Sequence, residues 1–307
     1  MLKNILVPLD GTPMSEAALA YAKVLAAKTG GSLTLMRAVH AVSSADAGSK
    51  QGRAIAEAEE YLAEFASELT ERGFTVTTGV PYGSAPAAWI VDEVGLRAAD
   101  LIVMATHDRA GTDRLLHGSV AEEVVHRSPV PVMLIRAAEG LRPAEGFHRE
   151  QPAIVVPLDG SPLAESALSA AVALASAIGG RFVLVGVVPA ASELIAGEGG
   201  AIVAYTGEEH ARLEGDAEAY LRSIGERVAA DGMSVTSLVR SGKPAAEIAD
   251  IAYTQSAAAI VMATHGRTGL VRTMRGSVAG EVVHRSTCPV VLVSPAWERR
   301  PVACAPS

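Results

Sequence analysis

Short apolar runs alternate with amphipathic stretches along the chain, first over residues 4–135 and again over residues 153–295. The first half contains five apolar runs of strand length, at residues 4–9, 32–39, 74–80, 101–106 and 130–135. The second half contains the corresponding runs at residues 153–158, 181–188, 233–239, 257–264 and 289–295. Apolar strands separated by helical stretches are typical of parallel sheets buried on both faces. Each half is therefore predicted to be an α/β domain with a doubly wound, five-stranded parallel sheet.

Helix signals occupy the gaps between these runs. Residues 13–30, PMSEAALAYAKVLAAKTG, begin with Pro13 and end at Gly30, and proline and glycine favour helix starts and ends respectively. Residues 52–73 form a second, strongly amphipathic stretch with helical period. The same order of signals returns in the second half, so we expect both halves to share one fold.

The two halves also repeat each other in sequence. ILVPLDGTPMSEAAL (5–19) corresponds to IVVPLDGSPLAESAL (154–168), and MATHDRAGTDRLLHGSVAEEVVHRS (104–128) to MATHGRTGLVRTMRGSVAGEVVHRS (262–286). The second half has about nine more residues between these landmarks, which we place in a long loop at residues 190–210. A period near 150 residues indicates a duplicated domain, because solenoid repeats have periods of about 20–50 residues.

The chain is predicted to have four parts: a first domain (1–137), a polar linker (138–151), a second domain (152–295) and a tail (296–307). The last apolar run of each half is short and contains proline, and an exposed sheet edge of this kind invites pairing. We expect the halves to pack through these strands as a pseudo-twofold pair within the chain. Association into a homodimer is left open.

Composition narrows the class of protein. Of the 307 residues, 49% are hydrophobic but only 4% are aromatic, so the expected core is aliphatic. A net charge of −8 argues against nucleic-acid and anionic-membrane partners, which require a basic surface. Cys288 and Cys304 are too few for a disulfide framework, and Cys288 is expected to be a small core residue. The chain opens on a strand and its most apolar helix is too short for a bilayer, so a cytoplasmic protein is expected.

Candidate binding residues lie beyond the first and fourth strands of each half, because ligands of open α/β sheets bind at carboxyl strand ends. The PLDG segments place Asp10 and Asp159 after the first strands. After the fourth strand of the second half, Gly276 and Ser277 precede a helix whose N-terminal amides favour an anion. The intervening loop contains no acid and three arginines, Arg267, Arg272 and Arg275. This combination suits a phosphate chain.

A Gly-Ser pair before a helix is also an ordinary turn and N-cap. In the first half Ser119 and Glu122 match a capping box, which explains that serine without any ligand. The second half has Gly280 in place of the glutamate, which favours an external anion at Ser277.

Taken together, the residues resemble a tandem universal stress protein, with two such domains in one chain. The resemblance rests on ILVPLDGTP and IVVPLDGSP, on DLIVMATH and AIVMATHG, and on the closing segments that begin GSVAEEVVHRS and GSVAGEVVHRS. It covers both halves outside the linker, the long loop and the tail, and it implies an adenine nucleotide alpha-hydrolase-like fold. Members that bind ATP are known by the pattern Gly-x-x-Gly, nine residues, Gly-Ser/Thr. The second half lacks only the first glycine, which is Ala263, whereas the first half has Ala105 and Asp108 at both positions.

The resemblance implies ATP, carrying Mg²⁺, as the ligand of the second domain. Asp159 would contact the adenosine end, Val187 would lie near the base, and the fourth-strand loop would follow the ribose and phosphates. The residues implied for this nucleotide site are Pro157, Leu158, Asp159, Val187, Ala263, Thr264, His265, Gly266, Arg267, Gly276, Ser277 and Val278. A weaker or lost site in the first domain would comprise Leu9, Asp10, Thr106, His107, Asp108, Gly118 and Ser119.

The second half has Gly266 where the first half has Asp108, and this difference predicts that the second domain is the main ATP site. Asp108 adds a side chain and a negative charge where a phosphate would approach, and Asp113 adds another acid to the same loop. Two like charges about 4 Å apart repel by about 1 kcal/mol in water and by about 4 kcal/mol at an effective dielectric near 20. Two other interpretations stay open, namely that Asp108 is a solvated loop acid or that it helps to hold Mg²⁺.

The sequence lacks the signatures of an ATP-using enzyme. It contains no Walker A motif, no Gly-x-Ser-x-Gly elbow and no histidine pair with zinc spacing, so no metal site made by the protein alone is expected. His126 and His284 are expected to complement helix C-termini. The leading hypothesis is a stress-response or regulatory protein that acts through nucleotide occupancy, with at most slow hydrolysis. A scaffold that binds no nucleotide is the alternative, and an ATP-using enzyme ranks third.

Overall fold

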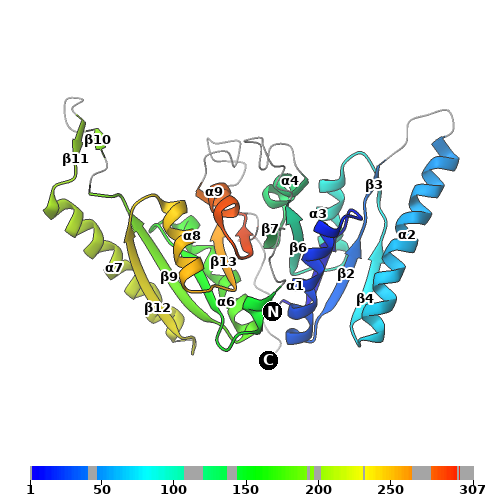
Figure 1. Ribbon diagram of the computed structural model, residues 1–307, viewed down its shortest axis with the longest axis horizontal. Helices are drawn as coiled ribbons and strands as arrows, with labels where there is room; N and C mark the ends of the chain where they lie inside the picture. The colour runs from blue at the N-terminus through cyan, green and yellow to red at the C-terminus, as the bar shows by residue number, and fades with distance from the viewer. Residues whose placement is uncertain are drawn as a thin grey trace.

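A computed structural model (Figure 1) describes residues 2–40, 47–106, 120–136, 144–191, 194–196, 202–230, 232–264, 278–295 and 297. The strands are β1 (Asn4–Pro8), β2 (Ser32–Met36), β3 (Val39–His40), β4 (Thr75–Gly79), β5 (Tyr82–Gly83), β6 (Leu101–Thr106), β7 (Val132–Arg136), β8 (Ala153–Pro157), β9 (Arg181–Val188), β10 (Leu194–Ala196), β11 (Ile202–Ala204), β12 (Val235–Ser241), β13 (Ala259–Ala263) and β14 (Val290–Val293). The helices are α1 (Pro13–Thr29), α2 (Ala47–Glu71), α3 (Pro86–Leu96), α4 (Val120–Arg127), α5 (Pro162–Glu165), α6 (Ala167–Ile178), α7 (Gly207–Ala229), α8 (Pro244–Thr254) and α9 (Val278–Arg285), together with a 3₁₀ helix, η1 (Glu145–His148).

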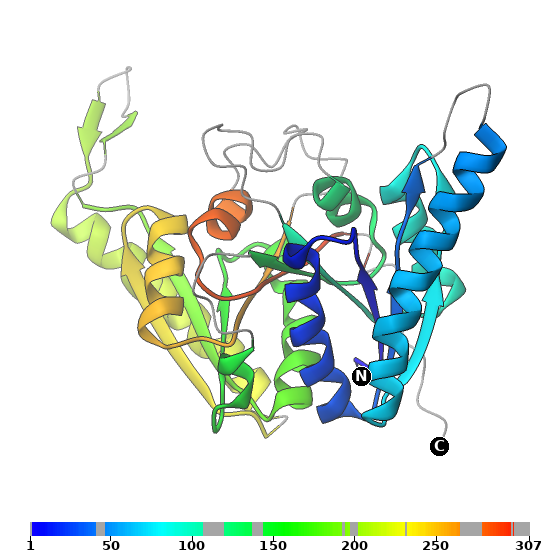
Figure 2. The same cartoon turned by 45° about the vertical axis from the view of Figure 1, so that its right-hand side comes forward.

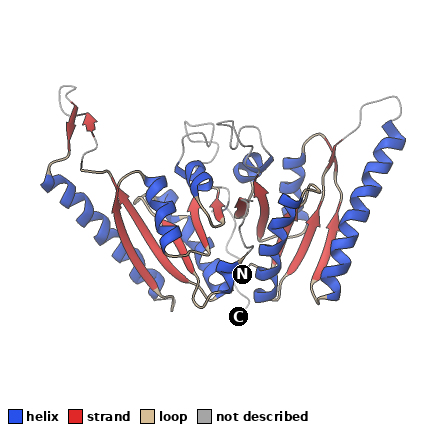
Figure 3. Cartoon of the chain, viewed as in Figure 1, coloured by secondary structure: helices blue, strands red, loops and turns tan. Residues whose placement is uncertain are grey.

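Ten of these strands form one continuous sheet in the order β12-β9-β8-β13-β14-β7-β6-β1-β2-β4. Neighbouring strands are parallel within each half, and the halves meet where β14 pairs antiparallel with β7. Figure 3 shows the strands of both halves fanned about this central pair. The predicted pair of doubly wound, five-stranded sheets, packed with pseudo-twofold symmetry through their last strands, is confirmed.

Helices cover both faces of this sheet and bury an apolar layer on each. Side chains of α1, α2, α6 and α7 share one buried cluster with the strands, and those of α3, α4, α8 and α9 share the other. Both clusters contain residues of both halves, so the core continues across the junction. Strands buried on both faces explain why the sequence shows apolar runs and not alternation.

Helix α1 begins and ends as the sequence predicts. Thr12 Oγ1 accepts a hydrogen bond from Ser15 N at 3.2 Å, Pro13 opens the helix, and Gly30 ends it with a φ of 61°. This left-handed conformation favours glycine because a Cβ would be strained there. In the second half the corresponding helical segment is divided at Ser166 into α5 and α6.

Two segments expected to be irregular are partly folded. In the linker, η1 places Phe147 in the core with 0% of its surface exposed, and its ring meets Tyr21 edge-on with centroids 5.6 Å apart. Residues 190–210, expected to form a loop, contain the antiparallel hairpin β10–β11 and the start of α7. Figure 2 shows this hairpin standing away from the main sheet, beyond the start of α7.

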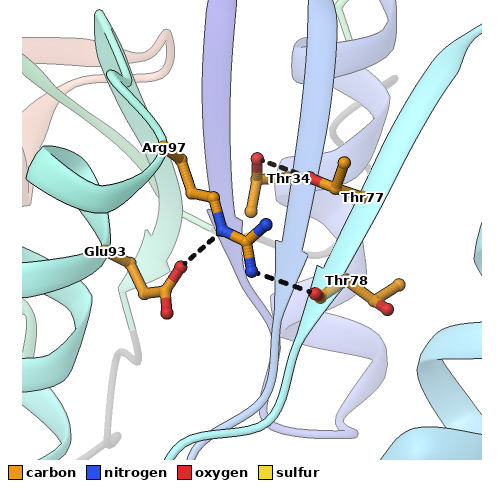
Figure 4. A network of polar contacts seen from close by, with 5 residues as sticks. All are labelled: Thr34, Thr77, Thr78, Glu93 and Arg97. Carbon is orange, nitrogen blue, oxygen red and sulfur yellow. Dashed lines mark hydrogen bonds and ion pairs between the residues drawn. The ribbon is translucent and has the colours of Figure 1, made fainter.

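The outer strand β4 has part of its free edge covered by a cation. Arg97 Nη2 donates a hydrogen bond to the backbone carbonyl of Thr78 at 3.5 Å, and Arg97 Nε pairs with Glu93 Oε2 at 3.0 Å. The hydroxyls of Thr34 and Thr77 lie 3.0 Å apart across the neighbouring strands (Figure 4). A charged side chain at a sheet edge disfavours pairing with another strand.

Candidate functional site

The strand order reverses beside β1 in the first half and beside β8 in the second. From β8 the chain moves outward to β9 and β12, and it then returns to β13 on the other side of β8. Strand β1 lies likewise between β2 and β6. Ligands of open α/β sheets bind at the carboxyl ends of strands at such switch points. The two strand ends predicted to flank a ligand are therefore neighbours in each half.

Matching turns carry Asp10 and Asp159 away from β1 and β8. Asp10 Oδ1 accepts a hydrogen bond from Thr12 N, and Asp159 Oδ1 accepts one from Ser161 N, both at 2.9 Å. The glycine that follows each aspartate has a φ of 84° in the first half and 82° in the second, which explains the Asp-Gly sequence. Both aspartates are exposed.

The first of these turns has additional hydrogen bonds from side chains of its own residues. Ser15 Oγ accepts a hydrogen bond from Asp10 N at 3.2 Å, and Thr12 Oγ1 donates a second bond to Asp10 Oδ1 at 2.6 Å. In the second half Ala164 occupies the position of Ser15 and has no hydroxyl to offer. The backbone amide of Asp159 therefore lacks the serine partner that the amide of Asp10 has, while Ser161 keeps a hydroxyl at the position of Thr12.

Arg37 creates a second difference between the turns. It follows β2 and lies so close to the first turn that a Cβ on Gly11 would be 2.8 Å from Arg37 Nη2. The strand registers place Gly186 at the corresponding position of β9, and a Cβ on Gly160 would meet no atom of the described residues within 4 Å. The turn at Asp159 is thus the more open of the two.

The leucines predicted for the site are core residues. Leu9 and Leu158 are 3% and 4% exposed, and Leu158 N donates to the carbonyl of Val185 at 2.8 Å. Their side chains pack in the cluster formed with α1 and α6, so they hold the strand ends in place. Pro157 is half-buried at the end of β8.

The fourth strands end on buried threonines. Thr106 closes β6 and Thr264 follows β13, and both are buried. Thr264 N donates to the carbonyl of Val293 at 2.9 Å, which ties this residue to β14. Ala263 and Val187 are half-buried, whereas Val278, which opens α9, is exposed.

The other predicted site residues lie outside the described residues, so their roles stay predictions. They are His107, Asp108, Gly118 and Ser119 of the first half and His265, Gly266, Arg267, Gly276 and Ser277 of the second, together with the loop residues Asp113, Arg272 and Arg275.

Sequence reasoning missed a carboxylate–tyrosine pair behind each aspartate turn. Tyr61 OH donates to Glu16 Oε1 at 2.9 Å, and Tyr220 OH donates to Glu165 Oε1 at 3.2 Å. Burial and the charge of Glu165 raise the pKa of Tyr220 to about 12, and burial and Glu16 likewise raise the pKa of Tyr61. Both phenols therefore stay protonated donors at neutral pH. The available signal was a repeated glutamate, in MSEAA and LAESA, and a repeated Tyr-Leu in both long helices.

Different arginines complete the two pairs. In the first half the Arg37 guanidinium lies 4.6 Å from the centre of the Tyr61 ring. In the second half Arg227 Nη1 lies 3.2 Å from the other oxygen of the carboxylate, Glu165 Oε2. The side chain of Arg227 is 65% exposed, so water screens this ion pair.

A Ser-His-Glu group at the ends of β9 and β12 has the composition of a catalytic triad but not its proton arrangement. His210 Nε2 lies 3.1 Å from the carbonyl oxygen of Pro189 and 3.0 Å from Ser241 Oγ. Ser241 Oγ donates to Glu214 Oε1 at 3.0 Å. The carbonyl requires a proton on Nε2, so His210 cannot accept the proton of Ser241. The group ties α7 to the strand ends and does not form an activated nucleophile.

The paired histidines lie in the last turns of α4 and α9, as predicted. His126 Nε2 is 3.9 Å from Glu122 Oε1, whereas His284 is exposed. Within the described ranges no three His, Cys, Asp or Glu side chains are arranged to hold a metal ion. The same part of the chain contains no helix with the length and apolarity that crossing a membrane requires.

Known proteins resemble this chain in sequence and in fold. The family model of the Universal stress protein family matches residues 1–136 and 152–294. A universal stress protein of Mycolicibacterium smegmatis is 25% identical over 302 residues, which are 95% of this chain and 97% of the relative. Another of Mycobacterium tuberculosis is 28% identical over 199 residues, which are 63% of this chain and only 61% of that relative.

Solved structures agree with the architecture. The crystal structure of a universal stress protein from Archaeoglobus fulgidus matches with a TM-score of 0.70 and 24% identity, over 96% of this chain and 97% of that one. This likeness supports the fold. Because the family matches both halves, the chain belongs to the universal stress protein family and carries its domain twice.

Proposed function

We propose that the chain binds Mg-ATP chiefly in its second domain and acts in a stress or regulatory response in the cytoplasm through nucleotide occupancy. The exposed Asp159 carboxylate at the switch point between β8 and β13 supports this proposal. A carboxylate at this place can accept hydrogen bonds from ribose hydroxyls. The fourth-strand loop and the start of α9 would then receive the phosphates, and Mg²⁺ would be held mainly by phosphate oxygens.

The observation that carries the proposal is the unequal space beside the two aspartates. Among the described residues no atom lies within 4 Å of a Cβ on Gly160, whereas a Cβ on Gly11 would lie against Arg37. Ser15 and Thr12 also occupy hydrogen-bonding positions at Asp10, and Ser15 has no hydroxyl counterpart in the second half. A nucleotide would therefore meet less competition at Asp159 than at Asp10. This difference favours the second domain, as does the presence of Gly266 where the first half has Asp108.

Slow turnover or none is the expected chemistry. Asp10 and Asp159 each accept a hydrogen bond from a backbone N–H of their own turn, which favours the ionised carboxylate, whereas a general base needs a positioned partner or a tuned pKa. His210 is engaged by Pro189 and Ser241, as described above. Bound ATP would act by favouring one conformation.

Isothermal titration of Mg-ATP into the full chain tests this function. We expect Asp159→Ala to weaken binding at least tenfold, and the matched variant Asp10→Ala to leave it nearly unchanged. Gly266→Asp should remove most binding, whereas Asp108→Ala should not weaken it. Mg-ATP at about 100 times its Kd should also add about 2.7 kcal/mol to the free energy of unfolding. Equal losses in Asp10→Ala and Asp159→Ala would contradict the assignment to the second domain.

A scaffold without a nucleotide is the second candidate function. The hydrogen bonds that each aspartate makes within its own turn favour it, because they give both residues a structural role in the absence of a ligand. No heat of binding and no thermal shift with Mg-ATP at millimolar concentration would support the scaffold.

A further inference from the structure

A chain of three hydrogen bonds connects the Asp159 carboxylate to the middle of α7. Ser161 N donates to Asp159 Oδ1 at 2.9 Å, and Glu165 N donates to the carbonyl of Ser161 at 3.2 Å. Tyr220 OH, from α7, then donates to Glu165 Oε1 at 3.2 Å. The turn that carries Asp159 is thus linked by hydrogen bonds to Tyr220 of α7, which lies 55 residues beyond Glu165 in the sequence.

The first half contains the same chain of bonds. Thr12 N donates to Asp10 Oδ1 at 2.9 Å, Glu16 N donates to the carbonyl of Thr12 at 3.2 Å, and Tyr61 OH donates to Glu16 Oε1 at 2.9 Å. Its recurrence in both halves indicates a feature of the domain and not an accident of one turn. The first half adds the contacts of Ser15 to this turn, so its aspartate depends less on the tyrosine.

The second turn has fewer local restraints and a stronger dependence on Tyr220. Ala164 provides no hydroxyl where Ser15 bonds the first turn, and helix α5 ends at Glu165, only four residues long. Glu165 N bonds the carbonyl of Ser161, whose own N–H bonds Asp159 Oδ1. A shift of Glu165 would therefore displace Asp159, at the end of the site proposed for the adenosine.

We propose that Tyr220 is a positioning residue of the second-domain nucleotide site, holding Asp159 for the adenosine end of ATP through Glu165 and Ser161. The inference rests on the proposed function. It assigns Tyr220 no contact with the nucleotide, and it predicts that its hydroxyl matters for the nucleoside part of the ligand and not for the phosphates.

Titration calorimetry with two probes, Mg-ATP and inorganic tripolyphosphate with Mg²⁺, separates positioning from a general structural role. Tyr220→Phe removes one oxygen and should weaken Mg-ATP binding about three- to tenfold while leaving tripolyphosphate binding unchanged. Tyr61→Phe, the matched change in the first half, should alter neither. Thermal melts without ligand should show similar small losses for both variants, because each loses one comparable hydrogen bond.

Glu165→Ala removes the other partner of the same hydrogen bond and provides an independent variant. Like Tyr220→Phe, it should weaken binding of Mg-ATP relative to binding of tripolyphosphate. The double variant should bind Mg-ATP no more weakly than the more affected single variant. Binding of Mg-ATP by wild type with no change in Tyr220→Phe, or equal losses for both probes, would overturn the positioning role alone. No Mg-ATP binding by wild type would overturn the proposed function and this inference together.

Discussion

Ser294 Oγ donates a hydrogen bond of 2.7 Å to the backbone carbonyl of Ser128, and the bond joins the two halves of the chain. Both residues are buried, so water cannot replace this bond. It lies beside the antiparallel pairing of β14 with β7, which extends over three residue pairs. The junction therefore combines a short ladder with at least one specific polar contact, and the two domains share one sheet.

Removal of this contact should destabilise the whole chain. Ser294→Ala leaves the Ser128 carbonyl with one partner fewer in a buried position, which typically costs about 1–3 kcal/mol. We expect the free energy of unfolding in urea to fall by about 1–2 kcal/mol, with a single transition because the core is continuous. Ser67→Ala, at an exposed position on α2, is the control and should change stability by less than about 0.5 kcal/mol. Equal effects of the two variants would argue against an energetic role for the junction bond.

Phe147 should make the linker a determinant of stability. Its side chain is fully buried against Tyr21, and truncation of a buried phenylalanine to alanine costs about 3–5 kcal/mol. We therefore expect Phe147→Ala to lower the free energy of unfolding by about that amount in denaturant titrations. His148→Ala, an exposed neighbour on η1, should have little effect. A small loss in Phe147→Ala would mean that the linker docks without contributing to the core.

The strands were predictable because burial on both faces leaves long apolar runs in the sequence. The hairpin β10–β11 was missed because Leu194–Ala196 and Ile202–Ala204 are three-residue strands within a glycine-rich segment, below the length at which a pattern is informative. The burial of Phe147 depends on Tyr21, which is distant in the sequence, so the linker's composition alone suggested a polar connection.

The candidate site was predictable only in part, for a similar reason. Asp10 and Asp159 follow from a local signal, a polar residue and glycine after an apolar strand. The contacts that distinguish their surroundings are nonlocal: Arg37 approaches Gly11 from the neighbouring strand, and Tyr220 reaches Glu165 from α7. No local pattern encodes which side chains from distant elements meet at a turn.

The two glycines after α1 should respond differently to substitution. A Cβ on Gly30 would meet no atom within 4 Å in the part of the chain that the structure describes, so the expected cost of Gly30→Ala is that of its φ of 61°, about 1 kcal/mol. A Cβ on Gly31 would collide with the backbone carbonyl of Lys3, which cannot move without disturbing β1. We expect Gly31→Ala to cost about 2–3 kcal/mol in chemical denaturation.

The second half provides an internal repeat of this experiment. A Cβ on Gly180 would lie 2.8 Å from the carbonyl oxygen of Pro152, whereas one on Gly179 would meet none of the described residues within 4 Å. Gly180→Ala should therefore be more destabilising than Gly179→Ala. The reverse order in either pair would show that the close backbone approach relaxes at little cost.

Cys288 should give the protein a pH-dependent stability in mild alkali. Burial raises the pKa of its thiol to about 11 from an ordinary value of 9.0, and this outweighs the hydrogen bond from Ser286. Between these values the unfolded chain releases a proton that the folded chain retains, so the free energy of unfolding falls as the pH rises.

Urea titrations across this range should show a decline of up to about 1.4 kcal/mol per pH unit that Cys288→Ala lacks. Tyr220, with its pKa raised to about 12, adds a further decline above pH 10 in both proteins, so only the difference between them reports the thiol. Parallel curves for wild type and Cys288→Ala would show that the thiol ionises alike in the folded and unfolded chains.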